Sequence, residues 1–243
     1  MNGIHRLKRW FSPLQGTPLH PQWLVISDAS RTRQVLAQTA RGIVLDIGCS
    51  DRWLEPCLKH STRYVGLDFP ATVSKGYAGQ PDVFGDGQRL PFASGSFDSV
   101  VLLDVLEHLP APSDAMAEAH RVLKPGGVLV MQVPFLYPLH DQPHDFQRWT
   151  EHGLRTLFGT HHFNIDSMTR HGHPLETAAS LLAIALANSL LDASRKMRPA
   201  VLLAPVLLAA IPLVNLVGWA LARMLPASSI MPMSYRVIAR KMP

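Results

Sequence analysis

From residue 42 to residue 133 the chain alternates short apolar runs with stretches of helical character, and this alternation limits the fold more than any other feature. The apolar runs cover residues 42–48, 64–68, 81–86, 98–104 and 127–133. They are continuously apolar, as expected for parallel strands that are covered on both faces. The sequence therefore predicts an α/β fold with a doubly wound, mostly parallel sheet.

Helices are expected between the strands, near 52–60 and over 113–124, and the second ends in the Pro-Gly stop of "LKPGG". After the fifth run we expect a loop, then a helix capped by Thr150, and then a strand over 162–168.

The end of the first predicted strand points to a nucleoside-containing ligand. Ligands of such sheets bind at the carboxyl ends of the strands, and Gly48, in "VLDIGCSDRW", lets the backbone approach one closely. The second strand ends in Asp68, 22 residues after Asp46, where a carboxylate can accept hydrogen bonds from ribose hydroxyls. The G-x-G-x-x-G fingerprint that cradles a pyrophosphate is absent. The sequence therefore favours a cofactor that contains a nucleoside but no phosphate.

Five motifs in order, "VLDIGCS", "YVGLD", "GDGQRLPF", "FDSVVLLDVLEHL" and "VLKPGGVLVMQVP", resemble those of the class I S-adenosylmethionine-dependent methyltransferases, particularly the small-molecule group with an L-P-F motif. The resemblance covers about residues 42–170 and 234–241. It implies a seven-stranded Rossmann-like sheet, with "SYRVIARK" (234–241) as an antiparallel last strand, and S-adenosyl-L-methionine as the cofactor. It extends loosely to methyltransferases of cell-surface polysaccharide pathways, through the "H…P-H-D…R-W-T" pattern of the loop after the fifth strand.

The resemblance also implies which residues bind the cofactor. These residues lie at the ends of successive strands: Asp46, Gly48, Cys49, Ser50, Asp68, Asp86, Gly87 and Asp104. The first loop would wrap the methionine part, Asp68 would hold the ribose, Asp86 and the Gly87 backbone would meet the adenine, and Asp104 would lie near the methionine amino group. The family often has glycine at the positions of Ser50 and Arg52, so the chain departs from the family pattern in this loop.

The loop 134–150, "PFLYPLHDQPHDFQRWT", follows the fifth strand on the edge where an acceptor would meet the methyl group. A hydroxyl acceptor needs its proton removed, and histidine is the commonest group for this near neutral pH. We therefore predict that His140 or His144 is the catalytic base. The alternative is a structural role, with Asp145 paired to Arg148 and the polar groups bonded to the loop backbone.

No metal site is predicted from the histidines. Pro143 disfavours a helix that would align His140 with His144, and methyl transfer does not require a metal. His108, in "LEHL", is expected to pack beneath the site.

Charge is distributed unevenly along the chain. Lys and Arg outnumber Asp and Glu by 6 to 1 in residues 1–41 and by 7 to 2 in 175–243, whereas 42–174 has 10 against 15. An enzyme of nucleic acids would place its basic face around the catalytic core, so a nucleic-acid partner is not expected. Basic flanks beside apolar segments favour an anionic lipid surface. Two cysteines, Cys49 and Cys57, and the lack of a signal-peptide pattern fit the cytoplasm.

Two uncharged apolar runs precede the last strand: 177–191, with 15 residues, and 199–222, with 24. A membrane span needs about 20 residues, so only the second is long enough. A single crossing would separate 234–241 from its sheet, and a spanning hairpin would carry the three basic residues of 195–198 across the bilayer. The sequence favours helices that lie in the interface of one leaflet. A helical lid or a dimer interface is the alternative, since such an apolar surface must be covered.

The N-terminal sequence supports a membrane surface. In "GIHRLKRWFSPL" the apolar residues fall at helical spacing with basic residues between them: Ile4, Leu7, Trp10, Phe11 and Leu14. This basic amphipathic pattern suits either a lipid surface or packing on protein.

Together these features divide the chain into an amphipathic extension (1–41), a cofactor-binding core (42–174), a hydrophobic helical insertion (175–230) and the last strand of the core sheet (231–243). The function predicted is S-adenosylmethionine-dependent methylation, on oxygen first, of an amphiphilic or lipid-linked small molecule or glycan at the inner face of the cell membrane. Two alternatives stay open. One is a soluble small-molecule methyltransferase with a lid or dimer insertion, and the other is a non-catalytic membrane adaptor on the same fold.

Overall fold

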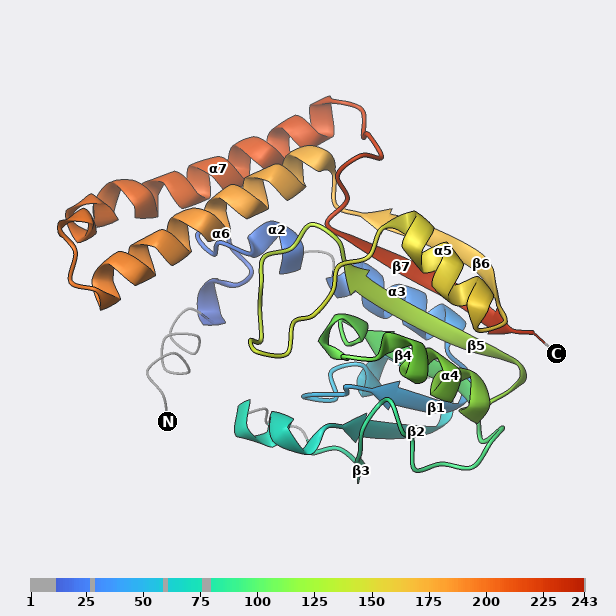
Figure 1. The fold of residues 1–243 in the computed structure, drawn as a ribbon. Coiled ribbons are helices and arrows are strands. Elements are labelled where there is room, and N and C mark those ends of the chain that lie inside the picture. The colour runs from blue at the N-terminus through green and yellow to red at the C-terminus, as the bar shows by residue number, and fades with distance from the viewer. Residues whose placement is uncertain (1–11, 27–28, 59–60, 76–79, 243) are drawn as a thin grey trace. The chain divides into compact units, whose positions relative to one another are not determined.

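The computed structural model describes residues 12–26, 29–58, 61–75 and 80–242 (Figure 1). The chain divides into two compact units. The sheet unit consists of residues 31–135, 139–170 and 234–243, and the hairpin unit of residues 1–30, 136–138 and 171–233.

A seven-stranded sheet with the order β3-β2-β1-β4-β5-β7-β6 forms the centre of the sheet unit. The strands are β1 (Gly42–Ile47), β2 (Ser61–Asp68), β3 (Val83–Phe84), β4 (Phe97–Leu103), β5 (Leu123–Pro134), β6 (Phe163–His171) and β7 (Ser234–Lys241). The pairs β2–β3, β1–β2, β1–β4 and β4–β5 are parallel, and β7 pairs with β5 in the antiparallel direction. This arrangement confirms the predicted fold class and the antiparallel last strand.

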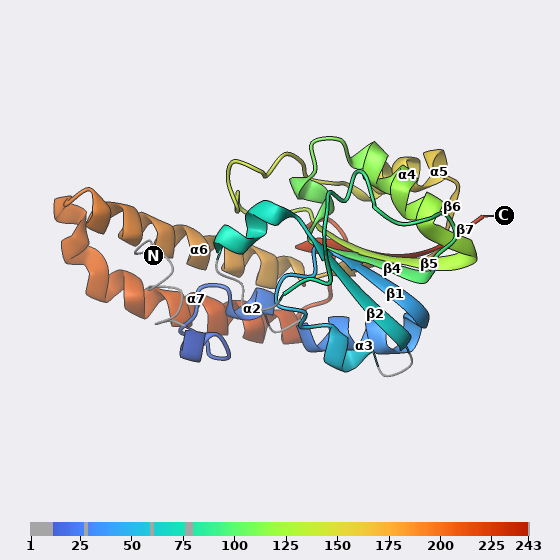
Figure 2. The same ribbon diagram turned by 90° about the horizontal axis from the view of Figure 1, so that it is seen from below.

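Helices cover both faces of the sheet. Figure 2 shows α4 (Pro112–Val122) and α5 (Glu151–Thr160) on one face, and α3 (Ala29–Thr39) on the other. Each face has its own apolar core: Met116 and Phe158 are fully buried in the first, and Leu36 in the second. Burial on both faces is the reason that the strands read as continuous apolar runs. As predicted, Thr150 caps α5, and its hydroxyl accepts a hydrogen bond from the Gly153 N–H (3.1 Å).

The helix expected near 52–60 is wrong, because the described part of this segment holds only a 3-10 turn at Glu55–Cys57. Arg52, just before this turn, has a φ of +55°, in the left-handed region that an α-helix does not use. Pro56 adds a residue without a backbone N–H. The alternation of strands and helices predicts a helix here, but the described backbone turns tightly after β1.

Two long antiparallel helices, α6 (Pro174–Arg195) and α7 (Ala204–Met224), form the hairpin of the other unit (Figure 1). They are joined through a 3-10 segment at Pro199–Leu203. Gly218 of α7 faces Ala179 of α6 so closely that a β-carbon at Gly218 would lie 2.4 Å from that of Ala179. Small residues therefore let the two backbones approach.

The helix α6 is longer than the uncharged run 177–191 suggested. A capping box at its start joins His173 and Glu176, and Asp192 to Arg195 extend its end, which gives 22 residues. Among the described residues, α6 and the stretch 199–224 are the two helices that have the length and apolar composition to cross a membrane. The judgement that the first arm is too short to span is therefore wrong, because polar residues at both ends belong to the same helix.

The helix α7 is apolar on its exposed side as well as on its buried side. Only Ile211, Asn215 and Gly218 are buried along this helix, whereas eight large apolar side chains are exposed: Val206, Leu208, Leu213, Leu216, Val217, Trp219, Leu221 and Met224. A surface helix of a soluble protein normally has a polar outer face, so α7 has the surface of a helix that another apolar phase or protein covers.

Asn215 of α7 anchors the N-terminal part of this unit. The side-chain amide of Asn215 donates hydrogen bonds to the carbonyls of Pro18 (2.8 Å) and His20 (3.0 Å), which precede the short helix α2 (Trp23–Ile26). The amphipathic pattern predicted for Ile4 to Phe11 lies outside the described residues, and Leu14 ends a 3-10 turn that begins at Ser12.

Candidate active site

Four carboxylates stand at or just beyond the carboxyl ends of four neighbouring parallel strands. Asp46 lies near the end of β1, Asp68 ends β2, Asp86 follows β3 and Asp104 follows β4. Because parallel strands end at the same edge of a sheet, the topology brings all four to one edge, where such folds bind ligands. The sequence predicted these four residues as cofactor ligands on the basis of the family resemblance.

The loop after β1 folds back onto β2. The N–H groups of Gly48 and Cys49 both donate to the carbonyl of Leu67, at 2.8 and 3.2 Å. Gly48 has a φ of +78°, and a β-carbon there would lie 2.4 Å from a methyl group of Val105. Glycine is therefore required at this position both by the backbone angle and by the lack of space.

The two positions at which the family often has glycine are the ones at which this loop is left-handed. Ser50 has a φ of +42° and Arg52 a φ of +55°. Arg52 compensates through its side chain: the guanidinium pairs with Glu55 (2.9 Å) and Asp82 (2.9 Å) and lies over the Tyr64 ring. The loop thus keeps a glycine-like backbone without glycine, and ion pairs hold it in place.

Replacing Ser50 with glycine is expected to stabilise the fold. A left-handed residue with a β-carbon costs about 1–2 kcal/mol, and the loss of the Ser50 hydroxyl, which accepts from the Asp51 N–H (2.6 Å), offsets part of the gain. We expect the free energy of unfolding of Ser50→Gly to rise by about 0.5–1 kcal/mol in urea denaturation. Ser50→Ala is the control because it keeps the β-carbon. Equal stability of the glycine and alanine variants would contradict the proposed strain.

Asp68 and Asp46 have different environments. The Asp68 carboxylate accepts hydrogen bonds from the backbone N–H groups of Ser50 (2.9 Å) and Phe69 (2.8 Å). A carboxylate has about four acceptor positions, so capacity remains for ribose hydroxyls. Asp46 is buried, and this burial raises the pKa of its carboxyl to about 7, with the nearby Asp68 adding to the rise and a hydrogen bond from the Tyr64 hydroxyl (2.7 Å) opposing it. Asp46 is therefore engaged within the chain, whereas Asp68 keeps acceptor positions that a ligand could use.

Cys49 is also buried, and burial raises the pKa of its thiol to about 12, with the neighbouring carboxylates of Asp46 and Asp68 contributing. The side chain therefore stays a thiol at neutral pH and acts as an apolar filler beneath the loop.

The segment after β3 is held by one side chain. Asp86 accepts from the backbone N–H (2.8 Å) and the side-chain amide (3.1 Å) of Gln88, whose amide oxygen accepts from the N–H of Ala111 (2.8 Å). Gly87 is buried, and a β-carbon there would lie 3.1 Å from Ile47 of β1. This packing places the Gly87 backbone against the end of β1, in keeping with its predicted contact to an adenine.

A hydrogen-bonded network that the sequence did not reveal supports Asp104. Its carboxylate accepts from the Gln132 amide (3.1 Å), and Gln132 in turn accepts from the buried guanidinium of Arg236 (2.8 Å). The Arg236 guanidinium also donates to the hydroxyl of Thr32. Crowding of the carboxylate by the surrounding chain, and then the charge of Glu107, raise the pKa of Asp104. The Asp104 side chain still has an exposed surface, where water screens these effects, so we expect it to be ionised at neutral pH.

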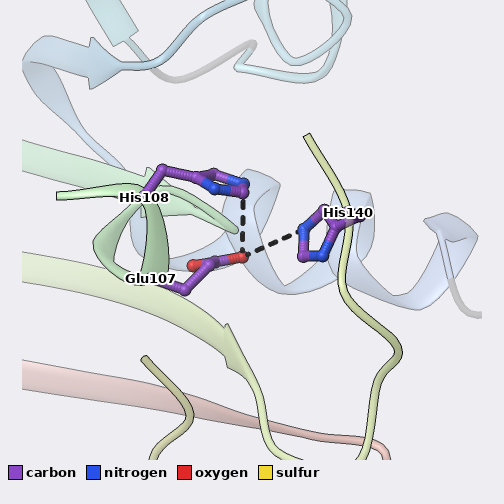
Figure 3. Close-up of side chains that lie close together, drawn as sticks. All are labelled: Glu107, His108 and His140. Carbon is purple, nitrogen blue, oxygen red and sulfur yellow. Dashed lines mark ion pairs between the residues drawn. The ribbon is translucent and has the colours of Figure 1, made fainter. Parts of the chain in front are cut away.

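Three further side chains lie together near the same edge: Glu107, His108 and His140 (Figure 3). The Glu107 oxygen Oε1 is 3.8 Å from Nε2 of His108 and 3.7 Å from Nε2 of His140, and the two imidazole rings meet edge to face at 4.8 Å. His108 was expected to pack beneath the site. Instead its ring faces Glu107, and its Nδ1 atom is 2.5 Å from the carbonyl of His144.

The two histidines predicted as bases occupy different places. His140 belongs to this three-residue cluster, whereas the ring of His144 is exposed and lies beside Phe146. The structural pair predicted in the same loop is confirmed: Arg148 binds both oxygens of Asp145, at 2.5 and 2.8 Å. This pairing lowers the pKa of Asp145 to about 2, and the Asp145 carboxylate also accepts from the backbone N–H of His140 (2.9 Å).

Comparisons with known proteins agree with this geometry. Residues 45–131, which run from β1 to β5, match the methyltransferase domain family. The chain contains a class I S-adenosylmethionine-dependent methyltransferase domain. The fold resembles the crystal structure of an S-adenosylmethionine-dependent methyltransferase from Archaeoglobus fulgidus, with a TM-score of 0.56 and 19% identity over 99% of this chain and all of that one. The predicted family, fold class and cofactor class are thus confirmed.

Relatives with higher sequence identity align with parts of the chain. An uncharacterized methyltransferase of Mycobacterium tuberculosis is 32% identical over 136 residues, which are 52% of this chain and 50% of the relative. A demethylmenaquinone methyltransferase of Renibacterium salmoninarum is 41% identical over 81 residues, 32% of this chain and 34% of the relative. The chain spans between about a third and a half of the length of the curated relatives it matches.

The residues of the methyltransferase edge suit the chemistry of the cofactor. S-adenosylmethionine carries a sulfonium and an ammonium cation, a ribose with two hydroxyls and an adenine. The edge offers carboxylates at Asp68, Asp86 and Asp104. At Gly48, in the loop after β1, there is no room for a side chain, so the backbone itself faces this edge. Carboxylates accept from hydroxyl and ammonium donors and attract positive charge. The donor set therefore fits this cofactor.

Proposed function

We propose that the protein transfers a methyl group from S-adenosyl-L-methionine to an oxygen of an amphiphilic or lipid-linked acceptor at the inner surface of the cell membrane. The observation that carries the transfer is the row of carboxylates at the ends of β1 to β4, within the segment that matches the methyltransferase domain family. The cofactor, when bound, supplies a methyl carbon that is activated by the positive sulfur.

The chain's own residues have three tasks in such a transfer. Asp68 and Asp104 orient the cofactor, which aligns its methyl group with the acceptor oxygen and so lowers the entropic part of the barrier. The cluster of Glu107, His108 and His140 lies in the segments that follow β4 and β5, and we expect it to receive the acceptor's hydroxyl proton. His140 is our prediction for the group that takes this proton, because its ring belongs to the cluster and that of His144 does not.

The exposed apolar surface of α7 supports a lipid environment for this reaction. Charges lie at both ends of the hairpin: Arg195, Lys196 and Arg198 at its turn, and Arg223 near the end of α7. Arg223 lies 3.9 Å from the centre of the Trp219 ring and pairs with Glu176 (3.6 Å). Arg and Trp are frequent at the level of lipid headgroups. A hairpin that lies in one leaflet keeps all of these charges among the headgroups, whereas a spanning hairpin would carry the turn across.

A relative supports an acceptor of this kind, since the Renibacterium protein is named for demethylmenaquinone. We propose the same class of small, lipid-soluble or lipid-linked molecule for this chain. The acceptor can be found by mass spectrometry of envelope lipids and glycans from cells with and without the gene. We expect one species to lose 14 Da in the cells without the gene. No such change in lipids, glycans or small metabolites, with S-adenosylmethionine bound by the protein, would favour a non-catalytic adaptor instead.

Substitution of the two candidate bases separates their roles. With the acceptor identified, we expect His140→Ala to lower kcat by at least about 100-fold, as loss of a proton acceptor does, and His144→Ala to change it less than about threefold. His152→Ala, on the exposed side of α5, is the control. The assignment fails if His140→Ala retains full turnover on the true acceptor.

A further inference from the structure

Glu107 is a buried carboxylate without a neutralising contact at bonding distance. Its side chain has no exposed surface, and neither of its oxygens has a hydrogen-bond partner among the described residues. A buried carboxylate in this state is costly unless a cation lies nearby. The imidazole nitrogens that face it, at 3.7 and 3.8 Å, lie beyond the range of an N–H···O hydrogen bond, which ends near 3.2 Å. The distances leave room for an ion between the three groups.

The outer nitrogen of His108 shows which of its two ring nitrogens carries the lone pair. A carbonyl oxygen only accepts, so the Nδ1 atom of His108, 2.5 Å from the His144 carbonyl, carries the hydrogen. The neutral ring then has its lone pair on Nε2, toward Glu107. The Nδ1 atom of His140 lies 3.4 Å from both the Asp145 carboxylate and the Arg148 guanidinium, and its Nε2 atom faces Glu107. The lone pair of His108 and the carboxylate of Glu107 thus face each other, with the second imidazole beside them, and two electron-rich groups in this position repel each other unless a cation lies between them.

From this convergence we infer that Glu107, His108 and His140 bind one divalent transition-metal ion, and that zinc is the metal that suits them best. Their three ligand atoms all lie within 4.8 Å of one another. Bonds of about 2.0–2.1 Å in a tetrahedral site place ligand atoms about 3.3–3.4 Å apart, so small rotations of the two rings complete the site. Figure 3 shows that Glu107 and His108 come from the segment after β4 and His140 from the loop after β5.

The ligand set indicates the kind of metal. Two imidazoles and one carboxylate suit zinc and similar transition metals, whereas magnesium and calcium prefer oxygen alone. Three protein ligands leave a further position open, as in catalytic zinc sites. The outer nitrogen of His108 donates to the carbonyl of His144, which is the usual arrangement around metal-binding histidines, and the outer nitrogen of His140 lies beside Asp145 and Arg148.

The open position assigns a role to the ion, and this role rests on the proposed methyl transfer. An acceptor hydroxyl bound there loses its proton to water more readily, because the ion lowers its pKa. The oxygen then forms its bond to the methyl carbon, and the carbon–sulfur bond breaks with its electron pair left on the neutral thioether. In the metal-bound protein His140 is accordingly a ligand, and the ion replaces it as the group that activates the hydroxyl.

Metal binding is tested on the full chain without reference to activity. Protein freed of metal with a chelator and dialysed is titrated with Co²⁺, followed by its visible absorption, and then with Zn²⁺ in competition. We expect one equivalent to bind with a tetrahedral-type spectrum that Zn²⁺ abolishes. Affinity should fall at least about 100-fold in Glu107→Gln, His108→Ala and His140→Ala, and about 10- to 100-fold in Asp145→Asn. His152→Ala is the matched control and should bind as the unaltered chain does.

Two results would overturn the inference: no stoichiometric binding by the unaltered chain, or unchanged binding by all three ligand variants. The first result would leave a proton shared between Glu107 and a histidine as the neutralising cation. Circular dichroism and calorimetric binding of S-adenosylhomocysteine show which variants are folded. If the variant of the buried Glu107 misfolds, the His140→Ala variant decides the test, because His140 lies in a surface loop. Metal binding without methyl transfer would contradict the proposed function alone, and methyl transfer that is unaffected by metal removal would contradict the role of the ion.

Discussion

Replacing Asp68 with alanine is expected to weaken the binding of S-adenosyl-L-methionine by at least about 100-fold. The side chain ends β2 at the ligand edge, and its carboxylate would accept charge-assisted hydrogen bonds from the ribose, each contributing about 1.5–3 kcal/mol. Loss of two such bonds corresponds to 100-fold or more in the dissociation constant. The same carboxylate holds the Ser50 N–H, so the loop after β1 also loses an anchor. Isothermal titration calorimetry of the folded variants measures the effect.

Two variants separate recognition from general damage. Asp68→Asn keeps an acceptor for the Ser50 N–H but lacks the charge, so its affinity should lie between those of the alanine variant and the unaltered chain. Asp166→Asn removes a carboxylate from β6, where it pairs with Arg240 on the surface, and should leave affinity unchanged. Unaltered binding by Asp68→Ala would show that the ribose lies elsewhere.

Three aspartates on the outer face of α7 are expected to abolish membrane binding. Leu213, Leu216 and Val217 are spaced as neighbours on one face of the helix and are about half exposed or more, at 63, 46 and 47%. If this face enters a leaflet, each side chain contributes about 1.5–3 kcal/mol to binding, so the triple substitution removes at least about 1,000-fold in affinity. Folding should persist because none of the three side chains is buried. Flotation of the full chain with vesicles that contain phosphatidylglycerol measures the change.

The matched control adds the same charge to the other unit. His152→Asp, Thr156→Asp and Thr160→Asp place three aspartates on the exposed side of α5, which tests whether added negative charge alone repels an anionic vesicle. We expect this variant to float. Flotation of the α7 variant, or failure of the unaltered chain to float, would contradict membrane insertion. A dimer that the α7 substitutions dissociate would then identify this face as a subunit interface.

The sheet could be predicted from sequence because burial on both faces leaves a simple pattern. The strands around Leu45, Val100 and Val130 read as continuous apolar runs because most of their side chains are buried. The carboxylates at the sheet edge could be predicted as cofactor-binding residues from the family resemblance and from their positions at the ends of strands. The turn at Glu55–Cys57 could not be predicted, because the left-handed angle at Arg52 depends on ion pairs with residues distant in sequence, such as Asp82.

The three-residue cluster could be predicted only in part. His140 was a candidate from its loop, but Glu107 and His108 lie 33 and 32 residues before it, and only the fold brings them together. The apolar residues around His108 in "LEHL" predict packing, because an apolar surround usually indicates core. A buried Glu beside a His in such a run was the signal available, since a carboxylate in a core requires a partner. The hydrogen bonds of Gln132 and Arg236 could not be predicted either. The two residues lie in different strands, β5 and β7, and only the pairing of these strands brings their side chains together.

The most direct test of the central claim is a calorimetric titration of the folded full chain with S-adenosyl-L-methionine, repeated with its demethylated product S-adenosylhomocysteine. The structure predicts one site for each chain, which both ligands occupy and which Asp68→Ala impairs. The absence of binding at saturating concentrations, in protein whose circular dichroism shows the α/β fold, would contradict the assignment of this sheet edge to the cofactor and with it the proposed methyl transfer.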